Sequence, residues 1–149
     1  MARMAPTHDA SPSIRTLAER IINAQQDEIA VMQQWLRDRG QPVPEPHPSG
    51  LPVMTGTGHH HGHSMPGMLT EAQLKQLDQA RGKEFDRLFL SFMIQHHSGA
   101  VSMVRELVGS TGAAQDDTVF KLASDINVDQ TTEIDRMQKM LAALLFESR

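Results

Sequence analysis

An apolar stripe at helical spacing runs through residues 84–109, and two adjacent histidines interrupt it. Apolar side chains recur three and four positions apart, which predicts a helix with one face packed on a core. The set is Phe85, Leu88, Phe89, Phe92, Met93, Ala100, Met103, Val104 and Leu107. His96 lies in the middle of this stripe and His97 lies on its flank. Because an unpaired polar group is costly to bury, each imidazole is expected to face a partner inside the fold.

Composition narrows the classes of protein that could carry such a helix. A chain of 149 residues is long enough for one domain with a core. The net charge of −4 leaves no basic patch and argues against nucleic acid as a partner. No apolar run is long enough to span a membrane. Cysteine is absent, which excludes disulfides and thiolate metal sites. The first eight residues lack the apolar core of an export signal, so any such signal is expected upstream.

Helical patterns occur in four segments, separated by stretches rich in Pro and Gly. Ser11 followed by Pro12 is typical of a helix start, with Ser11 as the cap. Thr70 with Gln73 matches a capping box. The predicted helices cover residues 12–38, a short stretch from 70 that ends near Gly82, 84–109 and 117–146. The sequence therefore predicts an all-α fold, an antiparallel bundle of three long helices and one short helix.

An internal repeat relates the first and last helices. Residues 14–36 align without gaps on residues 119–141, an offset of 119 − 14 = 105 positions. The matched pairs are Leu17/Leu122, Ala18/Ala123, Ile21/Ile126, Gln25/Gln130, Glu28/Glu133, Ile29/Ile134, Met32/Met137, Gln33/Gln138 and Leu36/Leu141. The polar matches in register indicate duplication. Residues 1–40 are interpreted as the back half of a first unit, 41–69 as a linker and 70–149 as a complete second unit. The chain is thus expected to begin midway through its first unit.

Helix geometry predicts what the histidines face. A short turn after Gly109 should make the last two long helices antiparallel neighbours. His97 lies 12 residues before Gly109, or ~18 Å along the helix, which places Gln130 and Glu133 at nearly the same level. Met93 and Met137 flank this level, and the repeat predicts a second acidic half from Gln25, Glu28 and Met32. Two interpretations stay open: a His–Glu hydrogen bond that fixes helix register, or a metal centre of imidazole, carboxylate and thioether ligands.

A second candidate metal site lies in the predicted linker. Residues 59–68 read HHHGHSMPGM, so that four histidines precede two methionines in a loop context. The candidate ligands are His59, His60, His61, His63, Met65 and Met68. Such a segment is typical of a flexible chelator, whereas a tag remnant or a merely polar linker would lack the interspersed methionines. The histidines suit nickel, zinc or Cu(II), and the methionines suit Cu(I).

The central motif resembles domain-of-unknown-function family 305. Residues 85–103 read FDRLFLSFMIQHHSGAVSM, and the QxxEIxxM pattern at residues 130–137 follows in the last helix. The resemblance covers a full unit over residues 70–141 and half of another over 1–36. It implies a ferritin-like helical bundle, a periplasmic or secreted location, and a role in copper binding and resistance. Its motif positions are Met93, His96, His97, Met103, Gln130, Glu133 and Met137.

These observations together lead to an expected function of copper handling, with silver as a related cargo and without catalysis. A structural helical module is the alternative, and a homodimer that completes the bundle is expected. A di-iron oxidase needs Glu-x-x-His pairs, which the chain lacks. A mononuclear copper redox enzyme at His96 and His97 is a further, weaker alternative.

Overall fold

Helices account for nearly all of the regular structure in a computed structural model of the protein, which describes residues 1–43, 65–110 and 116–147. The elements are a 3-10 helix η1 (Ala2–Thr7) and four α-helices, α1 (Pro12–Asp38), α2 (Glu71–Gln79), α3 (Gly82–Gly109) and α4 (Asp117–Glu147). No strand occurs in these three ranges. The predicted all-α class, with three long helices and one short one, is confirmed. None of the helices in the described ranges has the length and hydropathy to cross a bilayer.

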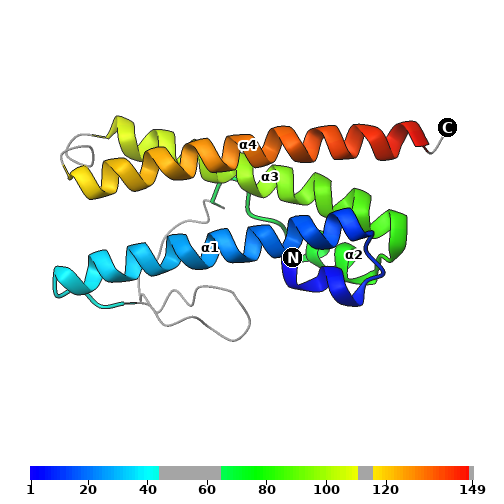
Figure 1. The fold of residues 1–149 in the computed structure, drawn as a ribbon, viewed down its shortest axis with the longest axis horizontal. Helices are drawn as coiled ribbons and strands as arrows, with labels where there is room; N and C mark the ends of the chain where they lie inside the picture. Colours follow the sequence, from blue (N-terminus) through cyan, green and yellow to red (C-terminus); the bar gives the residue numbers. More distant parts are fainter. Residues whose placement is uncertain (44–64, 111–115, 148–149) are drawn as a thin grey trace.

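Three long helices lie side by side, and the short elements gather at one end. Figure 1 shows α3 and α4 as an antiparallel hairpin, with α1 alongside and running opposite to α4. The contacts between α3 and α4 are extensive, whereas those between α1 and α4 are sparse. Both η1 and α2 lie at the end where α1 and α3 begin and α4 finishes (Figure 1).

The hydrophobic core lies at that same end. It takes the first turns of α1, the first half of α3 and the second half of α4. Its largest fully buried apolar side chains are Phe85, Phe89, Ile14, Leu17, Ile21, Leu77, Leu90 and Met137. Farther along α1 the apolar side chains Ile29 and Met32 are exposed. The first turns of α1 are therefore packed into the core, whereas its second half contributes no side chain to it.

The helix starts agree with prediction in position but not always in mechanism. At Thr70 both hydrogen bonds of the predicted capping box to Gln73 are present. Ser11 is the N-cap residue of α1, yet its side chain caps nothing. Instead the buried carboxylate of Asp86 accepts the Ser11 backbone N–H at 3.2 Å, and the Ser11 hydroxyl pairs with Ser13. A distant carboxylate thus satisfies the N–H of the cap residue itself, which is the bond that an N3 side chain makes in a capping box.

Gly82 was predicted near the end of the short helix, but it is the first residue of α3. Its φ of +57° lies in the left-handed region, which glycine tolerates without strain. Its N–H donates to the His8 carbonyl at 3.0 Å. The His8 ring in turn reaches the Asp78 carbonyl at 3.0 Å. This pair of bonds joins the segment after η1 to the junction between α2 and α3, an arrangement that the sequence did not predict.

Candidate metal centre

His97 lies in the interior of the α3–α4 hairpin, against Glu133. Its side chain is 0% exposed, and its Nε2 lies 2.7 Å from Glu133 Oε2. Since an ionised carboxylate can only accept, Nε2 carries the proton in this hydrogen bond. The Nδ1 atom of His97 is buried and has no partner among the described residues. In a neutral ring with Nε2–H, this Nδ1 presents a free lone pair to the interior, as a metal-binding histidine does when a carboxylate holds its other nitrogen.

His96 provides a second unpartnered nitrogen beside the first. Its ring centroid lies 6.1 Å from that of His97, at an interplanar angle of 61°. The Nδ1 of His96 is also buried and lacks a hydrogen bond within the described part of the chain. Burial lowers the pKa of His96, with smaller contributions from His97 and the amino terminus. His96 is therefore expected to be neutral near pH 7, which is the form of imidazole that binds metal.

The predicted methionine ligands fall into two groups. Met93 and Met137 are buried and belong to the core. Met93 precedes His97 by one helical turn, and Met137 follows Glu133 by one turn. Met103 lies two turns beyond His96 and is 37% exposed, so it is apart from this group. Met65 and Met68 are exposed as well, on the segment that leads into α2.

The remaining predicted ligands cannot be placed in the same way. His59, His60, His61 and His63 lie outside the described residues. Within the described ranges, no three His, Asp or Glu side chains lie close enough together to hold a metal ion between them. The contacts in the structure are those between the two imidazole rings and between His97 and Glu133, while Met93 and Met137 are buried one helical turn away along their own helices.

Two glycines that the sequence analysis passed over bring the end of the linker against α3. A Cβ on Gly99 would collide with the Pro66 carbonyl. A Cβ on Gly67 would lie 2.7 Å from the Gln95 carbonyl oxygen and 2.9 Å from that of His96. Residues 65–69 therefore cross α3 in direct backbone contact at the level of the histidine pair. The sequence feature that could have indicated this contact is Gly99, a glycine inside a regular helix. Glycine is disfavoured there unless another part of the backbone approaches closely.

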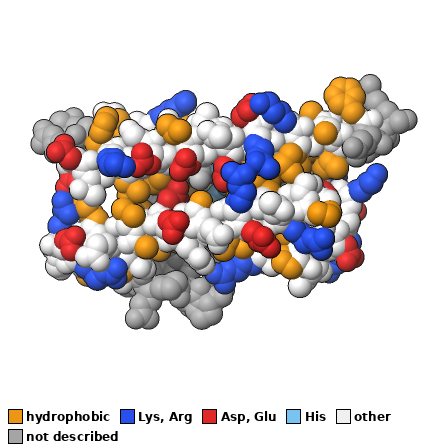
Figure 2. All heavy atoms as spheres, viewed as in Figure 1, with side chains coloured by type: hydrophobic (Ala, Val, Ile, Leu, Met, Phe, Trp, Pro, Cys, Tyr) orange, Lys and Arg blue, Asp and Glu red, His pale blue; other side chains and the backbone are white. Residues whose placement is uncertain are grey.

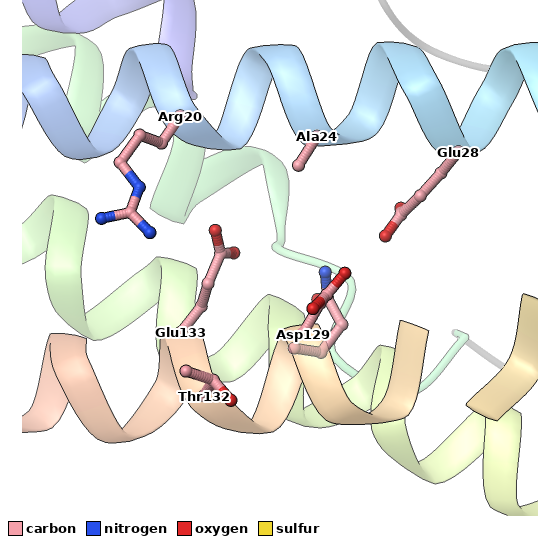
Figure 3. A pocket seen from close by; sticks show the side chains of 7 residues that line it. Arg20, Ala24, Glu28, Asp129, Thr132 and Glu133 are labelled. Carbon is pink, nitrogen blue, oxygen red and sulfur yellow. The ribbon is translucent and has the colours of Figure 1, made fainter. Parts of the chain in front are cut away.

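On the other side of Glu133, a cleft opens between α1 and α4. It encloses about 240 Å³ and is lined by Arg20, Ala24, Glu28, Asp129, Gln130, Thr132 and Glu133. Figure 3 shows Glu28 projecting from α1 toward Asp129, and Arg20 reaching toward Glu133. Figure 2 shows acidic side chains gathered over the middle of the face that α1 and α4 share, beside a hydrophobic patch.

The pKa of Glu28 reflects the carboxylates that line the cleft with it. Burial raises the pKa of Glu28, and the nearby charges of Asp129 and Glu133 raise it further, while His97 opposes them. Of the predicted second acidic half, Glu28 approaches Glu133, whereas Met32 is exposed. Glu28 and Glu133, which occupy equivalent positions of the predicted repeat, line the same cleft. Only Glu133 is hydrogen-bonded to a histidine.

Comparisons with a family model and with solved structures point to the same family. The family model of DUF305, described as a domain of unknown function, matches residues 1–141. No curated protein sequence matches the chain. A crystal structure of a DUF305 protein from Streptomyces coelicolor, described as a presumed secreted protein, is 27% identical, with a TM-score of 0.75. The alignment covers 96% of this chain and 82% of that one. A DUF305 fragment from Deinococcus radiodurans is 30% identical, with a TM-score of 0.68 and coverage of 89% and 78%.

Proposed function

Because this chain belongs to the DUF305 family, a family of unknown function, we propose a function from its own interior: it binds copper and sequesters it or hands it on, without catalysing a reaction. The observation that carries the proposal is the pair of buried, unpartnered Nδ1 atoms of His96 and His97. A buried polar atom without a partner is costly and calls for an explanation. A metal ion that accepts both lone pairs would remove that cost.

The surroundings of the two rings favour a soft metal. Met93 and Met137 are buried in the adjoining core, and thioether with imidazole is a donor set that suits copper, above all Cu(I). Silver has similar preferences and is a second cargo to test. Glu133 would act through His97, since its hydrogen bond to Nε2 orients the ring and makes it a better ligand.

The segment that precedes α2 supports a role in transfer. Residues 65–69 rest on α3 beside His96, and the four linker histidines come shortly before them in sequence. We propose that the His- and Met-rich stretch of residues 59–68 collects the ion and that the core pair retains it. Since the Streptomyces relative is described as a presumed secreted protein, we further propose that the protein acts outside the cytoplasm.

The alternative is a purely structural pair, in which His97 and Glu133 only hold α3 and α4 in register. The hydrogen bond of 2.7 Å favours this reading as well, because such a pair can fix helix register without any ligand. A useful variant must keep the bond to Glu133 and remove the free nitrogen. His97→Gln does so, since a glutamine amide can donate where Nε2–H does but has no atom in place of Nδ1.

The test is an anaerobic Cu(I) titration in competition with a chromophoric chelator. The double variant His96→Gln, His97→Gln is expected to lose at least about tenfold in affinity at the core, a change of ~1.4 kcal/mol. Met103→Leu, which alters an exposed methionine, is the matched control and should bind as the wild type does. To isolate the core, each protein is also titrated after serine replaces the linker histidines, namely His59, His60, His61 and His63. Unchanged Cu(I) affinity in the folded double variant would contradict the proposal and favour the structural reading.

A further inference from the structure

The segment that crosses α3 is a tight turn whose shape its own sequence favours. Residues 65–68 read Met-Pro-Gly-Met, and the Met68 N–H donates to the Met65 carbonyl at 3.0 Å. Proline suits the second position of a type II turn, and the third position requires a positive φ, which Gly67 supplies with +76°. We call residues 65–68 the Pro-Gly turn. It is therefore a small unit that can keep its conformation when it moves.

Helix α3 has a notch for this turn at Gly99. The nearest atoms that a Cβ on Gly99 would meet all belong to Pro66 or Gly67. From the opposite side, a Cβ on Gly67 would lie 2.7–2.9 Å from the Gln95 carbonyl, the Gly99 Cα and the His96 carbonyl. The two backbones therefore touch without a side chain between them, in the helical turn that carries His96. Any larger residue at position 99 must displace the Pro-Gly turn.

The bonds that hold the Pro-Gly turn in this notch are weak ones. Gln95 Nε2 donates to the Met68 carbonyl at 3.3 Å, and Gln95 Oε1 accepts from Gln73 Nε2 at 3.0 Å. The side chains of Met65 and Met68 are exposed, and no residue of this described turn belongs to the hydrophobic core. A segment without buried apolar contacts opens at low cost. The turn can therefore leave α3 while the helices stay packed.

The histidine pair needs an element that moves, because its free nitrogens do not reach solvent. The Nδ1 atoms of His96 and His97 are both buried, so an ion reaches them only when the structure around them opens. The bond between His97 and Glu133 joins α3 to α4, and the contacts between these two helices are extensive. Separating α3 from α4 would therefore cost much more than lifting the Pro-Gly turn, which lies against the His96 carbonyl.

We propose that the Pro-Gly turn is the gate of the copper centre: it leaves the notch at Gly99 to let the ion enter or leave, and it closes the site when it returns. This inference rests on the proposed function and adds how exchange of the ion is controlled. Entry and exit use the same opening, so the gate changes both rates by the same factor. The affinity is set by the ligands and does not depend on the gate.

The test compares two substitutions of glycine by alanine in α3. Gly99→Ala forces the turn out of its notch, because the added methyl group would collide with the Pro66 carbonyl. Gly109→Ala is the matched control, since a Cβ at that position meets nothing within 4 Å. Alanine favours a helix more than glycine does, so neither variant is expected to unfold α3. Gln95→Ala, which removes the bond to the Met68 carbonyl without a collision, is a second gate variant and should act in the same direction.

Stopped-flow measurements give the rates at which each protein takes up Cu(I) and loses it to a chromophoric chelator. All proteins carry serine in place of the four linker histidines, so that the core is observed alone. Gly99→Ala is expected to raise both rates at least about tenfold and to leave the affinity within about threefold of the wild type. Gly109→Ala should match the wild type. In the metal-free proteins, the methyl resonances of Met65 and Met68 should shift in Gly99→Ala and not in Gly109→Ala.

The outcomes separate the gate from the copper centre itself. Unchanged exchange rates in Gly99→Ala, with or without a shift of the methyl resonances, would overturn the gate and leave the proposed function standing. Faster release with an equal loss of affinity would mean that the ligands are damaged, and it would overturn the gate as well. Absence of Cu(I) binding at the core of the wild type would overturn both.

Discussion

The two helices that the predicted repeat relates, α1 and α4, have matching sequence patterns but opposite patterns of burial. In the first half of the repeat, Leu17 and Ile21 of α1 are fully buried, whereas their equivalents Leu122 and Ile126 of α4 are only partly buried. In the second half the order is reversed. Met137 of α4 is 0% exposed, and its equivalent Met32 of α1 is 40% exposed.

The reversal follows from the antiparallel arrangement of the two helices. The core lies at one end of the molecule, so α1 enters it with its first turns and α4 with its last turns. The apolar period therefore tells which face of each helix points inward, but not how far along the helix the core extends. The same contrast applies to the polar residues: Glu133 is hydrogen-bonded to His97, whereas Glu28 forms no ion pair among the described residues and lies near Asp129 and Glu133.

The largest expected difference in stability between α1 and α4 variants concerns the equivalent methionines Met32 and Met137. Met137→Ala should destabilise the protein by about 2–5 kcal/mol, because it leaves a cavity in the core. Met32→Ala should change stability by less than about 0.5 kcal/mol, because the side chain is exposed and lies outside the core. Urea unfolding followed by circular dichroism measures both. Similar losses in the two variants would mean that α1 is covered in solution, for instance by a second copy, and light scattering of the wild type would then identify the dimer.

In the first half of the repeat the expected losses of stability are smaller, and the larger loss is expected in α1 instead of α4. Ile21→Val should cost about 0.5–1.5 kcal/mol, since it removes a methyl group from a fully packed site. Ile126→Val should cost clearly less, because Ile126 is only partly buried. The same unfolding assay gives both values. A larger loss at Ile126 than at Ile21 would contradict the mirrored burial of α1 and α4.

Much of the fold could be predicted because local signals determine it. The Ser11–Pro12 start and the Thr70 capping box depend on neighbours in sequence, and both helices begin where predicted. The bond between Asp86 and the Ser11 N–H could not be predicted, because the two residues are far apart in the chain. The 3-10 helix η1 was missed for a similar reason: it has no helical period of its own, and it packs on α1.

The candidate site was predicted in part, and the reason is geometric. Counting equal distances from a helical hairpin's turn places His97 opposite Glu133, and the structure has the two in hydrogen-bond contact. Periodicity could not separate buried Met93 from exposed Met103, because both fit one apolar stripe. The approach of the 65–69 segment to Gly99 could not be foreseen, since it depends on a tertiary crossing.

The smallest expected effect, and the most specific to the cleft, is a pH dependence at Glu28. Its pKa is raised above the ordinary value of 4.5, chiefly by burial and then by Asp129 and Glu133, while His97 opposes the shift. The folded chain thus favours protonated Glu28 more than the unfolded chain does. Wild-type stability should therefore fall as the pH rises through the range that begins near 4.5. Glu28→Gln removes this loss without removing the side chain.

The variant should accordingly gain stability relative to the wild type between acidic and neutral pH. The gain should be less than about 0.5 kcal/mol, because solvent screens a carboxylate that is only half buried. Urea midpoints at a series of pH values measure it, and Asp27→Asn, an exposed neighbour on α1, is the control. A gain that is constant with pH would mean that Glu28 does not experience the charges of α4. Glu133 is already hydrogen-bonded to His97, whereas its repeat equivalent Glu28 has no such bond. The pH dependence of stability in Glu28→Gln therefore reports on the carboxylate without a histidine partner.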